Sequence, residues 1–203
     1  MRLGIFGGSF DPVHNAHLAI ARACQQQAKL DEVWFTPTAI QPLKHTGPRA
    51  SDRHRLEMLR LAIRDEPRWR VCSIEIDRGG FSYTVDTLRQ IHEELPDAEL
   101  FFLVGADALN DVATWKEPQE IFRMATPLVV CRAGQPSPDL DRLKLLCTSH
   151  TQPQLIDMPA MNVSSSEIRR RIDTGEPIDN LVPGAVADFI TQHRLYSQAA
   201  NEH

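Results

Sequence analysis

The sequence predicts an α/β fold in which helices cover both faces of a doubly wound parallel sheet. Short apolar runs of strand length alternate with amphipathic segments of helical length along nearly the whole chain, and this alternation is typical of βαβ units. The most apolar runs are continuous, which indicates strands buried on both faces. The 203 residues, 42% of them hydrophobic, suit one domain over residues 1–203.

The expected strands are short apolar runs bounded by glycine, proline or polar residues. The clearest is the run ELFFLVG at residues 99–105, and the first strand is closed by Gly7 and Gly8. Continuous runs of this kind suit buried parallel strands. The expected strands cover residues 3–6, 32–37, 69–77, 99–105, 127–132 and 154–158.

Helices are expected where apolar residues recur at helical spacing behind a capping residue. Ser51 has the chemistry of an N-cap, with Asp52 in the first turn, and Thr84 can cap a later helix. A long loop rich in Pro, Gly and Thr is expected over residues 38–50. The expected helices cover residues 17–30, 51–66, 85–94, 117–125, 139–147, 165–173 and 184–194.

This order of elements predicts a Rossmann-like sheet with right-handed crossovers. The helix-rich part from about residue 160 is expected to pack on the sheet as a small C-terminal appendage. In open sheets of this type, ligands bind at the carboxyl ends of the strands. We therefore expect the chemistry in the loops that follow Phe6, Pro37, Asp77, Val104 and Cys131.

The composition argues against several classes of protein. A formal net charge of -5, without a stripe of aromatic and basic residues, disfavours a nucleic-acid partner. No apolar run reaches the length of a membrane span and the start of the chain lacks a signal-peptide pattern, so we expect no membrane partner and a cytoplasmic location. Four widely spaced cysteines without a CxxC pair predict reduced thiols. The oligomeric state is left open, a homo-oligomer included.

The loop GGSFDPVHNAH at residues 7–17 has the parts of an anion site. The adjacent Gly7 and Gly8 let backbone amides approach a ligand closely. A helix begins within the loop, and the amides of its first turn carry partial positive charge. His14 and His17 are three residues apart, so they lie on one face of that turn, where each can donate a hydrogen bond to a phosphate oxygen.

Other interpretations of this loop fit less well. It is neither a GxGxxG motif nor a GxxxxGK[ST] P-loop. A His-x-x-His pair can bind a metal ion, but no third and fourth ligand follow at a sensible spacing, so we predict no protein metal site. A lone His14 would be interpreted as structural, whereas a second histidine after a glycine-rich turn favours the anion site.

Two segments resemble motifs of the nucleotidylyltransferase superfamily, whose members transfer AMP or CMP to a phosphate or alcohol. The first resembles the signature GxFDPxHxxH, with matches at Gly8, Phe10, Asp11, Pro12, His14 and His17. The second, VSSSEIRRRI at residues 163–172, is similar to the family's ISSTxIR segment. Serine hydroxyls and amides at a helix start form a second anion nest, to which Arg169 adds a charged donor. Without the first motif, this segment would be interpreted as an ordinary serine N-cap.

Three further segments resemble the bacterial nicotinate mononucleotide adenylyltransferases, and the resemblance covers residues 1–196. FSYTVDTL at residues 81–88 is similar to SYTxxTL, and VGADALNDVATWKE at residues 104–117 is similar to GxDxxxxxxxW. PLKH at residues 42–45 resembles PPHK, with Leu43 in place of the family's usual histidine region. Adenylyltransferases acting on phosphopantetheine lack the first two segments, and a cytidylyltransferase would show a different C-terminal motif.

The resemblance implies a role for each matching residue. The implied catalytic residues are His14, His17, Lys44 and Arg169. The implied ATP-binding residues are Gly7, Gly8, Ser9, Phe10, Asp11, Arg132, Ser164, Ser165 and Ser166. The implied substrate-binding residues are Tyr83, Thr84, Val85, Asp107, Trp115 and Lys116. Trp115 would stack on the pyridine ring, the alternative being an ordinary core tryptophan.

The implied reaction transfers AMP from ATP to nicotinate mononucleotide and yields deamido-NAD and pyrophosphate by direct attack. No nucleophile-plus-base constellation that would favour a covalent intermediate emerges from the residues. Mg²⁺ is expected to be carried with ATP, held by phosphates and water. Two alternatives stay open: an adenylyltransferase for another acceptor, such as nicotinamide mononucleotide or phosphopantetheine, and a nucleotide-binding regulator without turnover.

Overall fold

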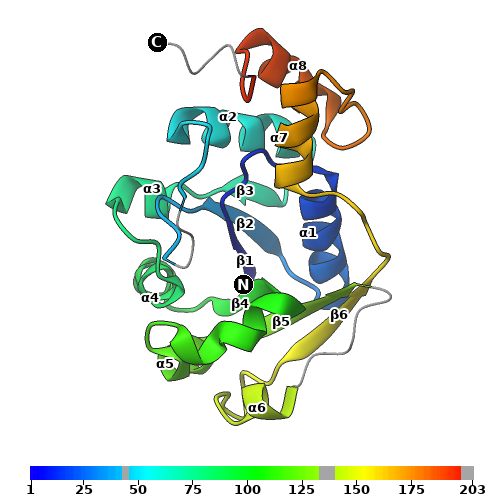
Figure 1. Cartoon of the computed structure of the whole chain (residues 1–203). Coiled ribbons are helices and arrows are strands. Elements are labelled where there is room, and N and C mark those ends of the chain that lie inside the picture. The colour runs from blue at the N-terminus through cyan, green and yellow to red at the C-terminus, as the bar shows by residue number, and fades with distance from the viewer. Residues whose placement is uncertain (43–45, 133–139, 198–203) are drawn as a thin grey trace.

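Six parallel strands form one central sheet in the order β3-β2-β1-β4-β5-β6 (Figure 1). The structure is a computed structural model that describes residues 1–42, 46–132 and 140–197, with the side chains of residues 110, 111, 132 and 142 left out. Every neighbouring pair of strands is parallel, which confirms the predicted type of sheet. The strands are β1 (Arg2–Gly8), β2 (Glu32–Pro37), β3 (Trp69–Val71), β4 (Glu99–Gly105), β5 (Ala125–Arg132) and β6 (Gln154–Met158).

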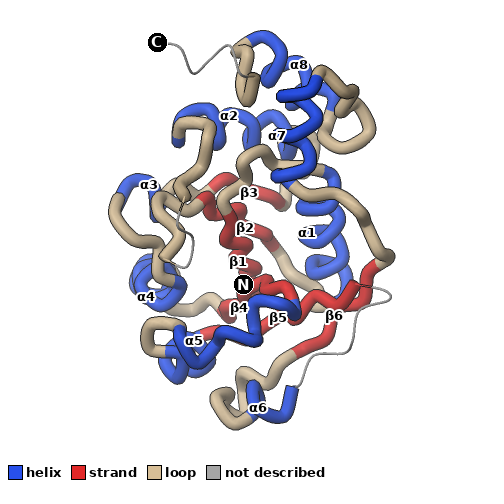
Figure 2. Tube along the Cα trace, viewed as in Figure 1, coloured by secondary structure: helices blue, strands red, loops and turns tan. Residues whose placement is uncertain are grey.

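Helices cover both faces of this sheet, as Figure 2 shows by their blue tubes around the red strands. One face packs against α1 (Asn15–Gln27), α2 (Asp52–Ile63), α7 (Ser165–Thr174) and α8 (Gly184–Gln192). The other face packs against α3 (Ile74–Arg78), α4 (Thr84–Glu94), the 3-10 helix η1 (Ala106–Thr114), α5 (Pro118–Met124) and α6 (Leu140–Lys144). The doubly wound arrangement is therefore as predicted.

The strand β4 shows why the central runs are continuously apolar. Leu100, Phe102 and Val104 point into the core beneath α4 and α5. Phe101 and Leu103, which alternate with them, point into the core beneath α1 and α8. Successive side chains of a strand face opposite sides of the sheet, so a strand between two helical layers needs an apolar residue at every position.

The chain changes its winding direction between β1 and β4. From β1 it moves outward through β2 to β3, and it then returns to place β4 on the other side of β1. The connections after these two strands diverge to opposite faces, which leaves a crevice at their carboxyl ends. Gly7 and Gly8 end β1 at this crevice, where they pair with Thr36 and Pro37 of β2.

The prediction of a strand over residues 69–77 was wrong beyond Val71. The strand β3 lies at the edge of the sheet and pairs only with β2. Its register would place Ser73 opposite Pro37, which has no N–H to continue the ladder. The chain turns instead into α3, whose end is followed by Gly79 and Gly80 with φ values of 68° and 67°.

Three smaller differences concern helices. The first helix begins two residues before the expected start, at Asn15, and the helix expected over residues 139–147 is described only as Leu140–Lys144. The 3-10 helix η1 (Ala106–Thr114) was not expected. Within the described part of the chain, none of the helices combines the length and the hydropathy needed to cross a bilayer.

Candidate active site

The loop between β1 and α1 is shaped by Phe10. This residue is buried and adopts a positive φ of 46°, while its ring contacts the rings of Phe6 and Phe35. A Cβ atom at Gly8 would lie 3.1 Å from the Phe10 ring, tighter than ordinary contact, whereas a Cβ at Gly7 would meet nothing within 4 Å. A side chain at Gly8 would therefore crowd the Phe10 ring, whereas Gly7 borders open space.

The two histidines of the loop lie against each other at the start of α1. Their rings are stacked with centroids 3.6 Å apart, and His14 is buried at the N-cap position. The backbone N–H of His14 donates to Nδ1 of His17 at 3.2 Å. A neutral ring that accepts through Nδ1 carries its proton on Nε2, so Nε2 is the donor atom of His17. The expected grouping of both imidazoles on one face is observed.

Part of the helix start is occupied by the C-terminal part of the chain. The backbone N–H of Asn15 donates to the carbonyl of Leu181 at 2.9 Å, and its side chain donates to the carbonyl of Asn180 at 3.0 Å. The first amide of α1 is therefore used within the protein, so an anion at this helix would depend more on the histidines than the sequence suggested.

Asp11 joins its own loop to two distant segments through its buried carboxylate. Oδ2 accepts the backbone N–H of Arg49 at 2.8 Å, and Oδ1 accepts that of Ala50 at 3.0 Å. The Tyr196 hydroxyl also donates to Oδ1, at 2.8 Å. Burial and the charge of Asp11 raise the pKa of the Tyr196 phenol. With these partners, the carboxylate of Asp11 serves to hold the loop in place.

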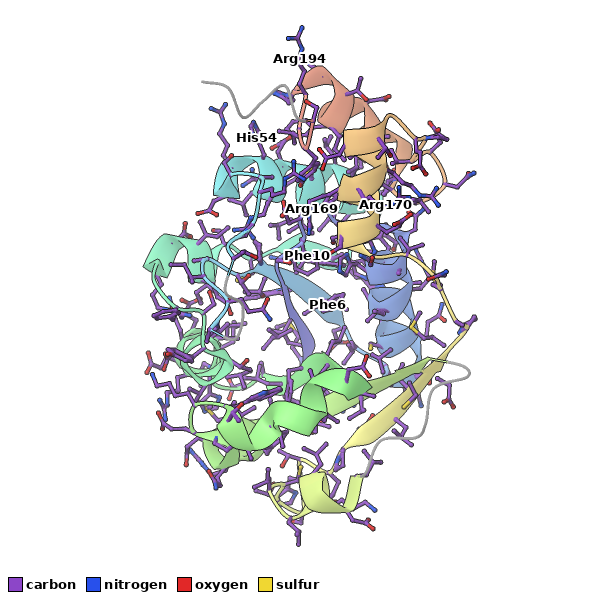
Figure 3. The ribbon with its side chains drawn as sticks, in the orientation of Figure 1. Phe6, Phe10, His54, Arg169, Arg170 and Arg194 are labelled. Carbon is purple, nitrogen blue, oxygen red and sulfur yellow. The ribbon has the colours of Figure 1, made fainter. Side chains whose placement is uncertain are left out.

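The helix α7 lies directly against this loop, as Figure 3 shows around Arg169 and Phe10. The Arg169 guanidinium donates to the carbonyl of Asp11 at 2.6 Å and to Oγ of Ser166 at 3.1 Å. The Ser165 hydroxyl donates to the carbonyl of Pro12 at 2.9 Å, and Oγ of Ser164 caps α7 by accepting from Glu167 at 3.2 Å. The two predicted motifs therefore meet, although about 150 residues separate them.

Arg55 is a residue of this region that the sequence interpretation missed. Its side chain is fully buried and donates to the carbonyl oxygens of Ser9 and Thr38, each at 2.7 Å. It thereby ties the loop after β1 to the loop after β2. The available signal was its position on α2, where it shares the buried face with Met58 and Leu59 at helical spacing.

A cavity of about 420 Å³ opens beside the glycines at the carboxyl ends of β1 and β4. It is lined by Gly7, Gly8, Tyr83, Thr84, Trp115 and Lys116 of the predicted residues. Val85 is fully buried and, like the exposed Asp107, lies outside the lining. His14, His17 and Arg169 also lie outside the lining and belong to the loop–α7 contact, whereas Asp107 belongs to neither place.

Trp115 forms part of the cavity wall while its back packs on the core. Its ring is nearly parallel to that of Phe122, with 6.4 Å between centroids, and lies edge-on to Phe102 at 6.4 Å. The residue is half-buried. The prediction of a stacking surface and the alternative of a core tryptophan are therefore compatible, since one part of the ring system packs inward and the residue still borders the cavity.

Lys116 joins the turn after η1 to the helix α4. Its Nζ lies 2.9 and 3.0 Å from the two carboxylate oxygens of Asp86 and 4.9 Å from the centre of the Tyr83 ring. The next residue, Glu117, pairs with Arg89 of the same helix. These contacts hold the turn over α4 at one wall of the cavity.

Glu75 is a second residue that the sequence interpretation missed. It lines the cavity and is buried, and its Oε1 accepts the hydroxyl of Thr87 at 2.7 Å. Burial raises the pKa of the Glu75 carboxyl. The mistaken strand over residues 69–77 hid this residue, because α3 is the element that carries it to the cavity.

Two of the predicted residues have cationic side chains that the structure does not describe. Lys44 lies outside the described residues, and Arg132 ends β5 with its side chain outside the description. In the described part of the chain there is no group of three or more His, Cys, Asp or Glu side chains arranged to hold a metal ion.

Comparison with known proteins gives close matches along nearly the whole chain. A family model described as cytidylyltransferase-like matches residues 5–171. A Thermus thermophilus protein named "Probable nicotinate-nucleotide adenylyltransferase" is 43% identical over 196 residues, covering 97% of this chain and 100% of that protein. A Clavibacter michiganensis protein of the same name is 41% identical over 196 residues, covering 97% and 94%.

Solved structures with the same fold include nicotinic acid mononucleotide adenylyltransferase from Plasmodium falciparum, complexed with NaAD. The TM-score is 0.79 at 22% sequence identity, over 96% of this chain and 97% of that chain. A likeness at this identity concerns the fold, and it extends to the C-terminal helices as well as to the sheet.

Proposed function

Because the chain belongs to the cytidylyltransferase-like family and, within it, to the nicotinate-nucleotide adenylyltransferases, we propose that it transfers AMP from ATP to nicotinate mononucleotide. The products are deamido-NAD and pyrophosphate, in NAD biosynthesis. The observation that carries the proposal is the adjacency of two sites: a histidine-bearing loop backed by α7, and a cavity whose lining includes both the glycines of that loop and Trp115.

The loop–α7 region suits the triphosphate of ATP. His14, His17 and Arg169 supply nitrogen donors at the start of two helices, where the helix dipoles also favour negative charge. Gly7 and Gly8 allow close approach of the backbone, and the serines 164–166 add hydroxyls. We assign the remaining phosphate contacts to Lys44 and Arg132. Ser9, Phe10 and Asp11 are assigned the role of shaping this loop.

The cavity suits the acceptor. Trp115 offers an aromatic face to the pyridinium ring, a contact worth about 0.5–2 kcal/mol. We place the carboxylate and phosphate of the acceptor at the Thr84 hydroxyl and at the amides of Val85 and Lys116, beside Tyr83. A charged carboxylate accepts from such donors more strongly than a carboxamide does, which favours the nicotinate substrate. Asp107 is proposed to contact a ribose hydroxyl.

The proposed reaction is an in-line displacement at the α-phosphorus of ATP. An oxygen of the acceptor's 5'-phosphate forms the new bond to phosphorus, and the bond to the bridging oxygen of pyrophosphate breaks. The attacking phosphate is already anionic at neutral pH, so the protein need not remove a proton. The protein residues would act by positioning the two substrates and by stabilising charge on the α-phosphate and on the leaving pyrophosphate.

A divalent cation, which we propose to be Mg²⁺, would accompany the nucleotide and neutralise charge on its phosphate oxygens. The histidine loop itself contains one acidic residue, Asp11, whose two carboxylate oxygens already accept three hydrogen bonds from the protein. This arrangement fits an ion held by phosphates and water. We further propose that residues 1–203 form one domain acting in the cytoplasm, with ATP and the mononucleotide as partners.

Pyrophosphate release is the direct test of this function. The purified chain is assayed with ATP and Mg²⁺ in parallel on nicotinate mononucleotide, nicotinamide mononucleotide and phosphopantetheine. We expect the highest kcat/KM with nicotinate mononucleotide. A preference for phosphopantetheine would contradict the proposed identity of the acceptor. If ATP binds but no pyrophosphate is released with any acceptor, the protein is a nucleotide-binding regulator.

A further inference from the structure

Glu75 is a buried carboxyl group that the proposed reaction leaves without a role. Its side chain lines the cavity, and the residue is 5% exposed. Oε1 accepts the Thr87 hydroxyl at 2.7 Å, and the Ser82 hydroxyl also interacts with the carboxyl group. Oε2 is buried and makes no hydrogen bond of ordinary geometry with the described residues. A buried carboxyl with one unsatisfied oxygen costs stability, so packing by itself does not explain its presence here.

The partner of Glu75 is placed to pass on its protonation state. The Thr87 hydroxyl lies 2.7 Å from Oε1 of Glu75 and 3.4 Å from the carbonyl of Tyr83, and it accepts from Arg78 at 3.0 Å. A hydroxyl has a single proton, so Glu75 and the Tyr83 carbonyl compete for it. An ionised Glu75 wins this competition, because a hydrogen bond to a charged acceptor is the stronger one.

Protonation of Glu75 reverses the hydrogen bond to Thr87. The carboxylic O–H can then donate to Oγ1 of Thr87, which leaves the threonine proton to the Tyr83 carbonyl. Tyr83 precedes the first residue of α4, and its carbonyl accepts the backbone N–H groups of Asp86 and Thr87. The hydrogen bond from Thr87 thus adds to the ties that orient the start of this helix.

The charges around Glu75 come from several elements. Arg78 of α3 interacts with it favourably and Ser82 adds a hydroxyl, but desolvation by burial is the larger effect and raises the pKa of Glu75 above its ordinary value. The Cys72 thiol beyond β3 also feels the charge of Glu75, and burial raises its pKa as well. Glu75 therefore changes its charge at a higher pH than an exposed glutamate.

We propose that Glu75 is a positioning residue for the acceptor: through Thr87 it sets the start of α4 at Tyr83, Thr84 and Val85, and it does so more firmly when protonated. This proposal rests on the proposed function, since Thr84 and the Val85 amide are the groups assigned to the acceptor. The affinity for the acceptor should fall as the pH rises through the titration of Glu75. The affinity for ATP should not change with this titration.

Calorimetric titration of nicotinate mononucleotide tests this between about pH 5 and pH 9. We expect the dissociation constant of the wild-type protein to rise about fivefold across the titration of Glu75, the size of one modest hydrogen bond. In the Glu75→Gln variant the amide N–H₂ donates to Thr87 at every pH, so the variant should keep the tighter binding throughout. The acceptor phosphate also titrates, near pH 6, but its effect cancels in the ratio of the variant to the wild-type dissociation constant.

Three further variants separate positioning from a general structural role. Thr87→Ser keeps the hydroxyl and should keep the pH dependence, whereas Thr87→Val should abolish it. Glu93→Gln removes an exposed carboxylate of the same helix and should match the wild type. Thermal unfolding of each variant shows whether it is folded.

The outcomes distinguish this inference from the function beneath it. The role of Glu75 is overturned, and the function left standing, by either of two results. One is a ratio of the Glu75→Gln to the wild-type dissociation constant that does not change with pH, and the other is a change in ATP affinity equal to the change in mononucleotide affinity. Absence of mononucleotide binding by the folded wild-type protein overturns both. A pH-dependent ratio for Glu75→Gln, reproduced by Thr87→Val and restored by Thr87→Ser, supports the inference.

Discussion

The two regions that meet at the carboxyl ends of β1 and β4 are built differently. In the loop–α7 region, polar side chains are buried or engaged with the protein: Asp11 accepts three hydrogen bonds and Arg55 donates to two carbonyl oxygens. In the cavity region, the hydrogen bond between Glu75 and Thr87 is buried, but the turn after η1 is held by partly exposed ion pairs, such as that of Lys116 with Asp86. The loop–α7 region is held by buried contacts, whereas the wall of the cavity formed by the turn after η1 is held by contacts that water can reach.

This difference has an energetic consequence. Exposed ion pairs contribute about 0–1 kcal/mol each, so a ligand can displace them at small cost. A buried group that loses its partner costs about 1–3 kcal/mol or more, so the loop–α7 region should change little when ligand binds. We infer that the phosphate contacts are preorganised, while the wall of the cavity at Lys116 adjusts to the acceptor.

The largest effect is expected from His17→Ala in the preorganised region. Removal of one donor to the developing phosphate charge should lower kcat about 100-fold or more, with the fold intact because the side chain is half-buried on the first turn of α1. Pyrophosphate release under saturating substrates measures this. His92→Ala, at an exposed position on α4, is the matched control. Near-normal turnover of His17→Ala would end its catalytic assignment.

A smaller effect is expected from Trp115→Ala in the cavity. Loss of the ring facing the pyridinium should raise the KM for nicotinate mononucleotide about tenfold, which corresponds to roughly 1.4 kcal/mol. The KM for ATP should stay the same, because Trp115 lines the cavity and the histidines lie outside that lining. Steady-state kinetics in each substrate measures both constants, and Trp115→Phe should fall between. An equal rise in both KM values would contradict the division into two regions.

The smallest effect is expected from Tyr196→Phe, which removes one of the donors to Asp11. The two backbone donors to this carboxylate remain, so the free energy of unfolding should fall by about 1 kcal/mol. Urea unfolding measures this loss, and acceptor KM should be unchanged because the contact belongs to the loop–α7 region. A change in acceptor KM larger than the change in ATP KM would show that the regions are coupled.

Much of this architecture could be predicted from local sequence patterns. The continuous apolar run at β4 predicted a strand between two helical layers, and Gly7, Gly8, His14 and His17 identified the first loop. The prediction was wrong after Val71, where the strand ends because the residue of β2 that would face Ser73 is a proline. Periodicity within residues 69–77 holds no information about which residue of β2 lies opposite.

The partners of the buried polar groups could not be predicted in the same way. Asp11 was recognised as a motif residue, but its hydrogen bond to Tyr196 spans 185 positions, and Arg55 and Glu75 were not singled out at all. Hydrophobic spacing and glycine placement act over a few residues, so their effects can be predicted from the sequence. Which carbonyl Arg55 meets, or which hydroxyl shares its proton with Glu75, depends on how the sheet order brings separate loops to one edge.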